Sequence, residues 1–488
     1  MLKFFPAAGM PAGRIALTLL LTFTAAPLLS AAPPTFNKDI APILYEKCVI
    51  CHRPGEVAPF SLLTYQDASK RAGLIATVTR SGYMPVWKPE AGYGKFQHER
   101  RLSAEQISLL GEWAKDGAPQ GNPKDKPAPP VFTEGWQAGE PNLILKAGNG
   151  FDVPADGPDR FQCFVLPLNL EQDSYIRTTE FRPGNRRVVH HGVIYVDESG
   201  TARKLAGDKG SYPCFGGPRV PATGLLGGWA PGTIVEPGDP QLSVPVRKGT
   251  DLVVQIHYHP SGKPETDTSS VGVIYGVPPT KGRTSVLMVN TNIDIPPGDS
   301  SYLVKSKITL PQDVEVSGVF PHAHWLCRDM KIDAFLPNGD VTHMVWIKDW
   351  DFNWQGGYRY QSPLHLPKGT RVELAYTFDN SEKNPRNPSS PPQRVTFGEQ
   401  TTDEMAVAFL TVLLPSPADV GSFQKEMRLS VLADILESGN LSQLRGRIPG
   451  LNGDRAQQMM KMFDKNGDGK LDADERTALI DFLRTMMK

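Results

Sequence analysis

Short runs of β-branched and aromatic residues, each ended by proline or glycine, fill the middle of this chain. Regularly spaced short strands with turn signals between them are typical of β-sandwich or barrel domains. A break near Pro279 divides the region, so we expect two β-sandwich, jelly-roll-like domains, at residues 136–279 and 280–415. The runs that carry this expectation include "NLILKA", "RVVHHGVIYVD", "TDLVVQIHYHP", "SVGVIYG", "SYLVKSKITL", "VTHMVWIKDW", "TRVELAYTF" and "MAVAFLTVLL".

Both ends of the chain have helical spacing instead. Apolar residues recur every three or four positions in "DIAPILYEKC" and "SAEQISLLGEWAKDG", and again in "FQKEMRLSVLADILESG". We therefore expect a helical domain at 35–121, a Pro- and Lys-rich linker at 122–135, and a helical region at 416–488. Equal numbers of acidic and basic residues, 52 each, give no electrostatic case for a nucleic-acid partner or an acidic membrane surface.

The first 31 residues have the layout of a secretory signal. Lys3 and Arg14 precede an apolar run, and small residues around Ala31 suit cleavage. The run is too short for a spanning helix, although a retained anchor is the alternative. We expect an exported protein, periplasmic or extracellular, without stable membrane insertion after cleavage.

Five cysteines are present, and two of them belong to a "CVICH" motif. In a compartment where disulfides persist, Cys163 and Cys214 are the expected pair among the other three. Cys327 is then unpaired, and we expect a buried free thiol there, with a pairing outside this scheme as the alternative.

The "CVICH" motif is the attachment sequence of c-type haem. Cys48 and Cys51 would bond the porphyrin, and His52 would supply an axial nitrogen. A zinc or redox C-x-x-C is the alternative, but no second C-x-x-C exists to complete a four-ligand zinc site. Met84 is the expected sixth ligand, because a thioether suits electron transfer, and His98 is its rival. Residues 35–121 resemble the cytochrome c domains fused to larger exported bacterial oxidoreductases.

Six of the ten histidines lie in three tight groups within the β region. In "VSGVFPHAHWLC" (316–327), His322 and His324 alternate along an apolar run that we expect to form one strand, so both would point to the same face. A single pair could be a harmless solvent face. Three groups in strand-like runs indicate a metal site, for which copper, zinc and iron are all suitable. The groups are His190–His191, His257 with His259, and His322 with His324.

These motifs resemble, in order, those of the copper type II, ascorbate-dependent monooxygenases, the peptidylglycine α-hydroxylating and dopamine β-monooxygenase family. The similarity covers about 131–415, through "RVVHHGVIYVD", "LVVQIHYHP", "FPHAHWLCRDMK" and "TTDEMAVAFL". The resemblance implies two copper ions in two β-sandwich domains. It assigns one copper to three histidines and the other to two histidines and a methionine: His190, His191 and His257, then His322, His324 and Met405. His259 falls outside this set, although the order "HYH" leaves open which of its two histidines binds.

The same resemblance implies the activity. Oxygen activation and C–H attack would take place at the site of His322, His324 and Met405, and electrons would be stored at the trihistidine site. The implied enzyme is a monooxygenase that hydroxylates a small organic substrate with O2 and electrons from an external donor, ascorbate or a redox protein. We expect the haem to replace or supplement ascorbate. The alternative is a non-catalytic haem and copper protein for electron transfer or copper binding.

Three positions bear on the substrate. Peptidylglycine hydroxylases bind a peptide carboxylate with Arg, Asn and Tyr side chains, and the matching positions here are Phe320, Val407 and Phe409. Apolar side chains cannot offset the desolvation of a carboxylate. We therefore expect an apolar or aromatic substrate rather than a peptide C-terminus.

The segment "DKNGDGKLDADE" (464–475) fits the calcium-binding loop of an EF-hand. Gly469 stands at the sharp turn that the loop requires. We expect one calcium ion there, with an acidic turn that binds nothing as the alternative. The expected ligands are Asp464, Asn466, Asp468, Lys470 through its carbonyl, Asp472 and Glu475.

Overall fold

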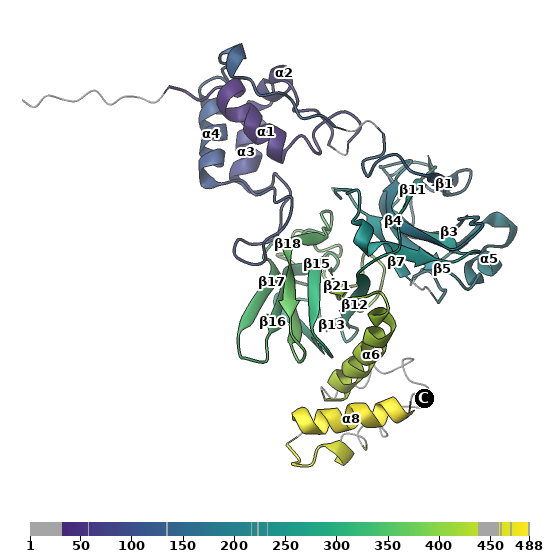
Figure 1. Ribbon diagram of the computed structural model, residues 1–488. Coiled ribbons are helices and arrows are strands. Elements are labelled where there is room, and N and C mark those ends of the chain that lie inside the picture. The colour runs from purple at the N-terminus through teal and green to yellow at the C-terminus, as the bar shows by residue number, and fades with distance from the viewer. Residues whose placement is uncertain are drawn as a thin grey trace, which may run out of the picture.

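The computed structural model describes residues 32–56, 58–132, 135–215, 217–221, 224–231, 233–437, 458, 461–468 and 471–486. The expected signal segment, 1–31, lies outside the described residues. Within the described ranges, no helix is both long and apolar enough to cross a membrane. Figure 1 shows a helical unit at the N-terminal end, two neighbouring β units, and the helices α6 and α8 towards the C-terminus.

The N-terminal helical unit packs short helices around its own apolar core. Trp113 is fully buried, and its indole nitrogen donates to the carbonyl oxygen of Pro119. A capping box starts the longest helix, because the Ser103 hydroxyl accepts from the Gln106 amide while the Gln106 side chain accepts from the Ser103 amide. The elements are η1 (Phe36–Ile40), α1 (Ala41–Lys47), α2 (Tyr65–Ser69), α3 (Ala72–Arg80), α4 (Ala104–Lys115) and η2 (Pro123–Asp125).

The N-terminal β unit, residues 143–275, consists mainly of two packed antiparallel sheets. One has the strand order β6-β3-β9-β5-β7 and the other β1-β11-β4-β8, with a small β10-β2 pair beside them. A disulfide joins Cys163 to Cys214, as the sequence predicted. The strands are β1 (Leu143–Lys146), β2 (Phe151–Val153), β3 (Arg160–Pro167), β4 (Ser174–Arg182), β5 (Val189–Asp197), β6 (Ser211–Pro213), β7 (Gly224–Trp229), β8 (Val244–Val246), β9 (Asp251–Tyr258), β10 (Glu265–Asp267) and β11 (Ser270–Tyr275). The helices are α5 (Thr201–Ala206), η3 (Gly207–Lys209) and η4 (Pro240–Leu242).

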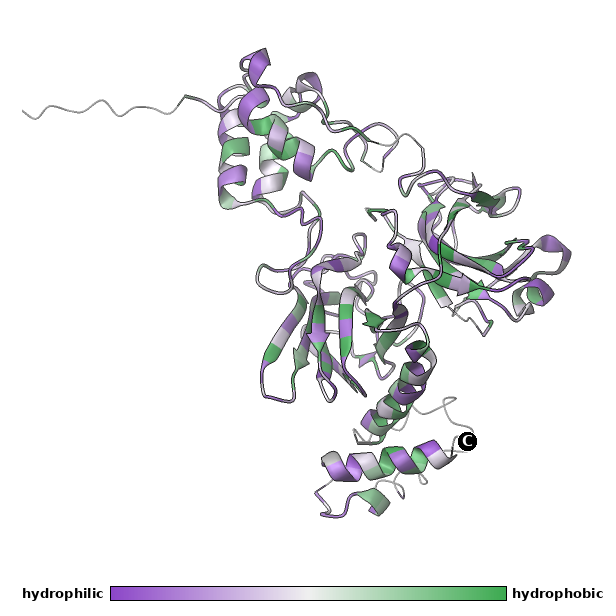
Figure 2. Ribbon diagram, in the orientation of Figure 1, coloured by the Kyte–Doolittle hydropathy of each residue, from purple (hydrophilic) through white to green (hydrophobic). Residues whose placement is uncertain are grey.

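The C-terminal β unit, residues 282–414, repeats this plan with sheets β12-β21-β15-β18 and β14-β19-β16-β17, and a β13-β20 pair. Burial alternates along β19, and Figure 2 shows alternating hydrophobic and hydrophilic bands on strands of this unit. Cys327 is a buried free thiol, as expected. The strands are β12 (Gly282–Asn290), β13 (Asp294–Ile295), β14 (Tyr302–Thr309), β15 (Val314–His322), β16 (Cys327–Phe335), β17 (Val341–Ile347), β18 (Tyr358–Leu366), β19 (Arg371–Phe378), β20 (Val395–Thr396) and β21 (Ala406–Leu414).

The C-terminal helices are attached to the second β unit. Helix α6 (Asp419–Glu437) carries the buried Asp434, whose carboxylate accepts from the amide of Thr309 at the end of β14. The same carboxylate lies 2.9 Å from Arg476 of α8 (Ala473–Met486). A buried ion pair between helices therefore also holds them against a strand.

An arm of the helical unit, residues 84–101, inserts into the C-terminal β unit. Phe96 is 1% exposed and belongs to that unit's core, stacked on Tyr360 with ring centroids 5.1 Å apart. Backbone hydrogen bonds from Gln97 to Arg359 and from Gln361 to Lys95 extend the edge strand β18. The sequence did not predict this insertion.

The architecture confirms the expected β-rich, multidomain fold with helices at both ends. One local expectation was wrong. The strand that carries His322 ends at that residue, and His324 lies in the turn before β16. The Glu404 carboxylate accepts the amide protons of His324 and Leu326, and these bonds replace strand pairing.

The inserted arm yields a stability prediction. Phe96→Ala should lower the free energy of unfolding of the C-terminal β unit by about 3–5 kcal/mol, because it leaves a large cavity in a packed core. Tyr83→Ala is the matched control, since Tyr83 is 59% exposed and should change little. Chemical denaturation followed by hydrogen exchange in β18 measures both. Equal effects of the two substitutions would contradict the insertion.

Candidate metal centres

The first histidine group lies on the five-stranded sheet of the N-terminal β unit. His190, His191 and His257 each offer a ring nitrogen, and these three atoms lie within 4.8 Å of one another. His191 pairs directly with His257 across β5 and β9, so both side chains stand on the same face. Among the described residues, this is the only group of three His, Cys, Asp or Glu side chains at metal-binding distance.

A β-bulge allows two adjacent histidines to join one site. Neighbouring residues on a regular strand point to opposite faces, but the pairing of β5 with β9 shifts between Val189 and His191. The Nδ1 atoms of His190 and His191 lie 3.1 Å apart. This spacing is compatible with both nitrogens binding one ion at about 2.0 Å.

The protonation of the group suits a metal. Burial, with the nearby His257, lowers the pKa of His190 to about 3, and burial lowers the pKa of His191 well below its ordinary value. Within the described part of the chain, neither ring nitrogen of the buried His257 has a hydrogen-bond partner. Buried polar atoms without partners are costly, and a bound ion would satisfy one of these two nitrogens.

Asp159 supports His257 from behind and was missed by sequence reasoning. Its carboxylate lies 3.0 Å from His257 Nε2 and 2.7 Å from His259 Nδ1. Burial would raise the pKa of Asp159, but its contacts with the two histidines outweigh burial and lower it. His259 itself is exposed and lies outside the group. Of the two histidines of "HYH", His257 is therefore the one that lies with His190 and His191.

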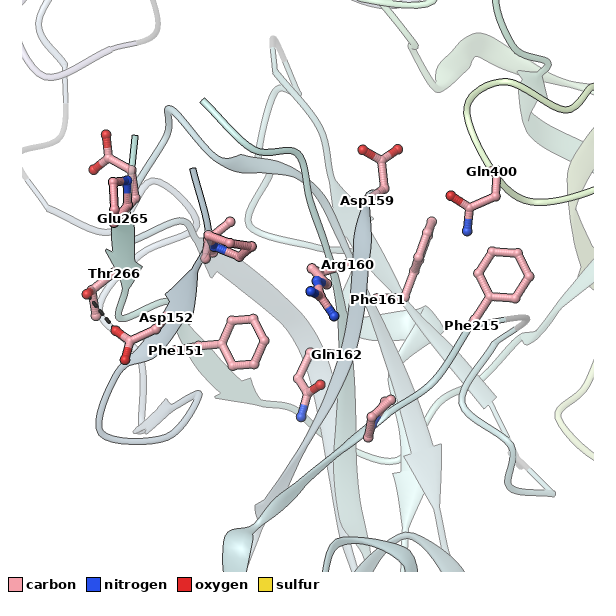
Figure 3. Close-up of a pocket in the computed structure, with 14 residues that line it drawn as sticks. Phe151, Asp152, Asp159, Arg160, Phe161, Gln162, Phe215, Glu265, Thr266 and Gln400 are labelled. Atoms are coloured by element: carbon pink, nitrogen blue, oxygen red, sulfur yellow. Dashed lines mark hydrogen bonds between the residues drawn. The ribbon is translucent and has the colours of Figure 1, made fainter. Parts of the chain in front are cut away.

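A groove of about 860 Å³ opens beside this support, as Figure 3 shows. Phe161 lines it and stacks on His257, with ring centroids 4.2 Å apart and planes inclined by 13°. Phe215 meets Phe161 edge-on, and Gln400 of the C-terminal β unit reaches the rim. One aromatic ring therefore separates the groove from the histidine group.

The second histidine pair lies on the C-terminal β unit. The rings of His322 and His324 have centroids 5.2 Å apart and are nearly perpendicular. His322 Nδ1 lies 2.6 Å from the side-chain oxygen of Gln355, and His324 Nδ1 lies 3.0 Å from the carbonyl oxygen of Asp403. Both contacts fix Nδ1 as the donor and leave Nε2 for a ligand. Burial lowers the pKa of His322 to about 4 and that of His324 to about 3.

Glu404 connects this pair to Met405. The buried Glu404 carboxylate accepts from the amides of His324, Leu326 and Met405, at 2.9, 2.5 and 3.2 Å. Burial raises its pKa to about 8. Val407, two residues after Met405, pairs with His322 across β15 and β21, and the amides of Met405 and His324 share the Glu404 carboxylate.

Phe352 lies between the two histidine groups. Its ring stacks on His190, with centroids 4.9 Å apart, and meets His324 edge-on at 5.7 Å. The separation of these two histidine rings therefore cannot exceed the sum of the two distances. Sequence reasoning did not identify Phe352 or Gln355, because neither belongs to a motif.

The residues of "CVICH" form a turn at the end of α1. The amides of Cys51 and His52 donate to the carbonyl oxygen of Cys48, and the two thiols are not joined to each other. His52 Nδ1 lies 3.1 Å from the carbonyl oxygen of Phe60, which leaves Nε2 free to face an iron. These features fit a covalent haem.

The two candidates for the sixth ligand have different surroundings. Met84 is half-buried in the turn after α3, and its amide donates to the carbonyl oxygen of Val78. His98 is half-exposed, and its Nε2 lies 2.9 Å from the Glu236 carboxylate on the N-terminal β unit. This contact gives His98 a partner other than a haem.

The candidate calcium loop is described in part, since Gly469 and Lys470 lie outside the described residues. The buried Glu475 carboxylate accepts from the amides of Lys465 and Asp472. Asp464, Asn466 and Asp472 each accept a backbone N–H within the loop. The described carboxylates are not gathered at metal-binding distance and instead order the turn.

Comparisons with known proteins add no argument about this chain. No family model matches it, and no curated protein does. Among solved structures, a subviral particle of infectious bursal disease virus VP2 is 8% identical with a TM-score of 0.18, covering 58% of this chain and 74% of that one. The major capsid protein P2 of bacteriophage PM2 is 7% identical, with a TM-score of 0.21 and coverage of 50% and 99%. The peptide N-glycanase PNGase F is 14% identical, with a TM-score of 0.21 and coverage of 56% and 89%. TM-scores this low support no inference.

The depressed histidine pKa values predict the pH dependence of the metal-free protein. The folded-state pKa values of His190 and His322, about 3 and about 4, lie below the unfolded value of about 6.5. The unfolded chain therefore binds more protons between these limits, so stability should fall as the pH drops below about 6.5. Each such histidine contributes up to about 1.4 kcal/mol per pH unit. Urea unfolding of chelator-treated protein between pH 6.5 and 5 measures this slope, and a flat profile would contradict it.

The position of Asp159 predicts a role in metal affinity. Asp159→Asn keeps the size of the side chain but removes the charge that faces His257, so affinity for Cu(II) at the first group should fall about 10–100-fold. Asp152→Asn is the matched control, because Asp152 lines the same groove but hydrogen-bonds Thr266 instead. Competition titration against a chelator measures both. An Asp159 variant that binds Cu(II) as tightly as the unaltered chain would count against this role.

Proposed function

We propose that this chain is an exported, copper-dependent monooxygenase that carries its own c-type haem. The observation that carries the proposal is the meeting of two histidine groups, one from each β unit, where the ring of Phe352 contacts a histidine of each. A simple copper carrier needs one such group. The disulfide between Cys163 and Cys214 supports export.

The donor sets divide the work between two copper ions. Three imidazoles, from His190, His191 and His257, support cycling between Cu(I) and Cu(II), whereas a thioether from Met405 favours Cu(I). Copper bound at His322, His324 and Met405 would supply the activation of O2 for attack on a C–H bond. The chain's own part is to hold these imidazoles oriented and away from bulk water.

Outer contacts do this orienting. Gln355 and the Asp403 carbonyl hold the rings of His322 and His324 through their Nδ1 atoms. The Glu404 carboxylate ties the backbone of His324 to that of Met405, so these two ligands share one anchor. Asp159 supports His257 in the other group.

The surface beside the second group favours an apolar or aromatic substrate. Phe320 pairs with Phe409 across β15 and β21, with ring centroids 6.3 Å apart, next to the pair of His322 and Val407. Leu287, the partner of Phe409 on β12, is 46% exposed. This strand face offers hydrocarbon where a peptide carboxylate would need a cation.

A contact between the helical unit and the first β unit supports the haem as electron donor. Glu56 lies four residues after His52, and its carboxylate is 3.4 Å from Arg186, four residues before His190. The haem attachment turn therefore lies against the loop that leads into the trihistidine strand. The haem would receive its electrons from an external donor. Separately, one calcium ion would bind at 464–475.

Metal and product analysis tests the proposal. The purified holoprotein should contain two coppers, one covalent haem and one calcium per chain. A panel of apolar and aromatic small molecules under 18O2 should yield an alcohol that carries the label, with O2 uptake that depends on both copper and the organic molecule. Copper binding without such uptake would favour the electron-transfer or copper-binding alternative. Turnover of a peptidylglycine model compound would overturn the assigned substrate class.

Met405 provides a sharper prediction. Met405→Leu keeps the volume of the side chain but removes the thioether, so bound Cu(I) should fall from two ions per chain towards one, and substrate-dependent O2 uptake should be lost. Met344→Leu is the matched control, because Met344 lies in the core of the same unit. X-ray absorption at the copper edge should show a sulfur ligand in the unaltered protein and none in the Met405 variant. A sulfur signal that survives the substitution would exclude Met405.

A further inference from the structure

One short loop of the C-terminal β unit contacts both histidine groups. It follows β17 and runs from Trp350 to Gln355. The Trp350 indole nitrogen donates to the carbonyl oxygen of His324 at 3.1 Å, and Gln355 holds His322. Gln355 also donates to the carbonyl oxygen of Phe352, which closes the loop on itself. The loop therefore contacts the second histidine pair through both Trp350 and Gln355.

Phe352 is the part of this loop that reaches the N-terminal β unit. Its ring is 5% exposed and stacks on His190 with the planes inclined by 16°. On its own unit it contacts His324 and Trp325, with ring centroids 5.7 and 4.8 Å away. Trp350 belongs to the apolar core of the unit, whereas Phe352 does not. Two of the three rings that contact it are imidazoles of the histidine groups.

A second side-chain link between the β units, the ion pair of Glu236 with Arg359 on β18, has a different character. Glu236 forms an ion pair with Arg359, but the arginine side chain is 53% exposed and the glutamate 24%. Exposed ion pairs contribute little and are screened by salt. A desolvated aromatic stack is the stronger constraint on distance.

We propose that Phe352 is the positioning residue that sets the separation of the two metal centres. Its ring holds His190 against the loop that orients His322 and His324. Closure of one β unit on the other therefore orders both centres at the same time. The proposal rests on the proposed function, which supplies the two metal ions. Phe352 binds no metal itself.

The test compares three variants of the full-length chain loaded with Cu(II). Phe352→Ala removes the ring, Phe352→Tyr retains it, and Arg359→Gln breaks only the exposed ion pair between the units. Pulsed dipolar EPR measures the copper–copper distance. A single short distance is expected for the unaltered chain, the Tyr variant and the Arg359 variant. Phe352→Ala should give a longer or broader distribution with two coppers still bound. An unchanged distribution in the Ala variant would overturn the proposal, as would an equal change in the Arg359 variant.

A second measurement separates this proposal from the proposed function. Hydrogen exchange of the copper-free chain reports the contact without any metal. Phe352→Ala should accelerate exchange in peptides that cover 189–191 and 350–355, and Phe352→Tyr should restore protection. If the unaltered chain bound fewer than two coppers, the proposed function would fail, and this measurement alone would decide the role of Phe352. Exchange that is unaffected in the Ala variant would refute it.

Discussion

The structure depends on imidazoles that are buried at the place where two β units meet. His257 is 2% exposed and His324 is 3% exposed, and burial lowers the pKa values of His190, His322 and His324 far enough to keep these three rings neutral at physiological pH. Burying a polar ring costs free energy unless each nitrogen has a partner. In the second group, Gln355 and the Asp403 carbonyl satisfy one nitrogen of each ring. The second nitrogen of each ring is available to an electrophile. A metal ion is the electrophile that imidazoles at this spacing bind best.

The two groups bring neighbouring histidines to one side of the backbone in different ways. On β5, a bulge lets His190 and His191 share one face, and the pairing of His191 with His257 completes the group within one sheet. In the C-terminal unit, the strand ends at His322, and the Glu404 carboxylate holds the turn that returns His324 to the same side. The first group is thus as rigid as its central strand, all eight residues of which are buried. The second depends on a turn and a buried carboxylate.

The sequence predicted what is local or patterned. It identified the β-rich middle, the helical ends, the disulfide and the histidine groups, because period-two runs and residue spacing are visible in one dimension. It could not predict Asp159, Phe352 or Gln355, whose roles come from contacts that no local pattern encodes. The Phe96 arm was missed for a similar reason, since its apolar face fills another unit's core rather than its own. The prediction for His324 was wrong because the alternation of His322 and His324 is also typical of a strand. In the structure, a backbone hydrogen bond to the buried Glu404 carboxylate takes the place of strand pairing at His324.

The distribution of contacts indicates which part of the molecule can move. The helical unit anchors to the C-terminal β unit through the buried Phe96, and the C-terminal helices anchor to the same unit through the buried Asp434. Contacts of the N-terminal β unit with these parts include two partly exposed ion pairs, Glu236 with Arg359 and Glu56 with Arg186, and the buried ring of Phe352. Exposed ion pairs yield at small free-energy cost, whereas a core aromatic does not. The ion pairs of the N-terminal β unit should therefore yield more easily than the stack of Phe352 on His190, and loss of that stack would separate His190 from the loop that orients His322 and His324. Under the proposed function, the contact of Phe352 with His190 would then govern both substrate entry and the assembly of the two centres.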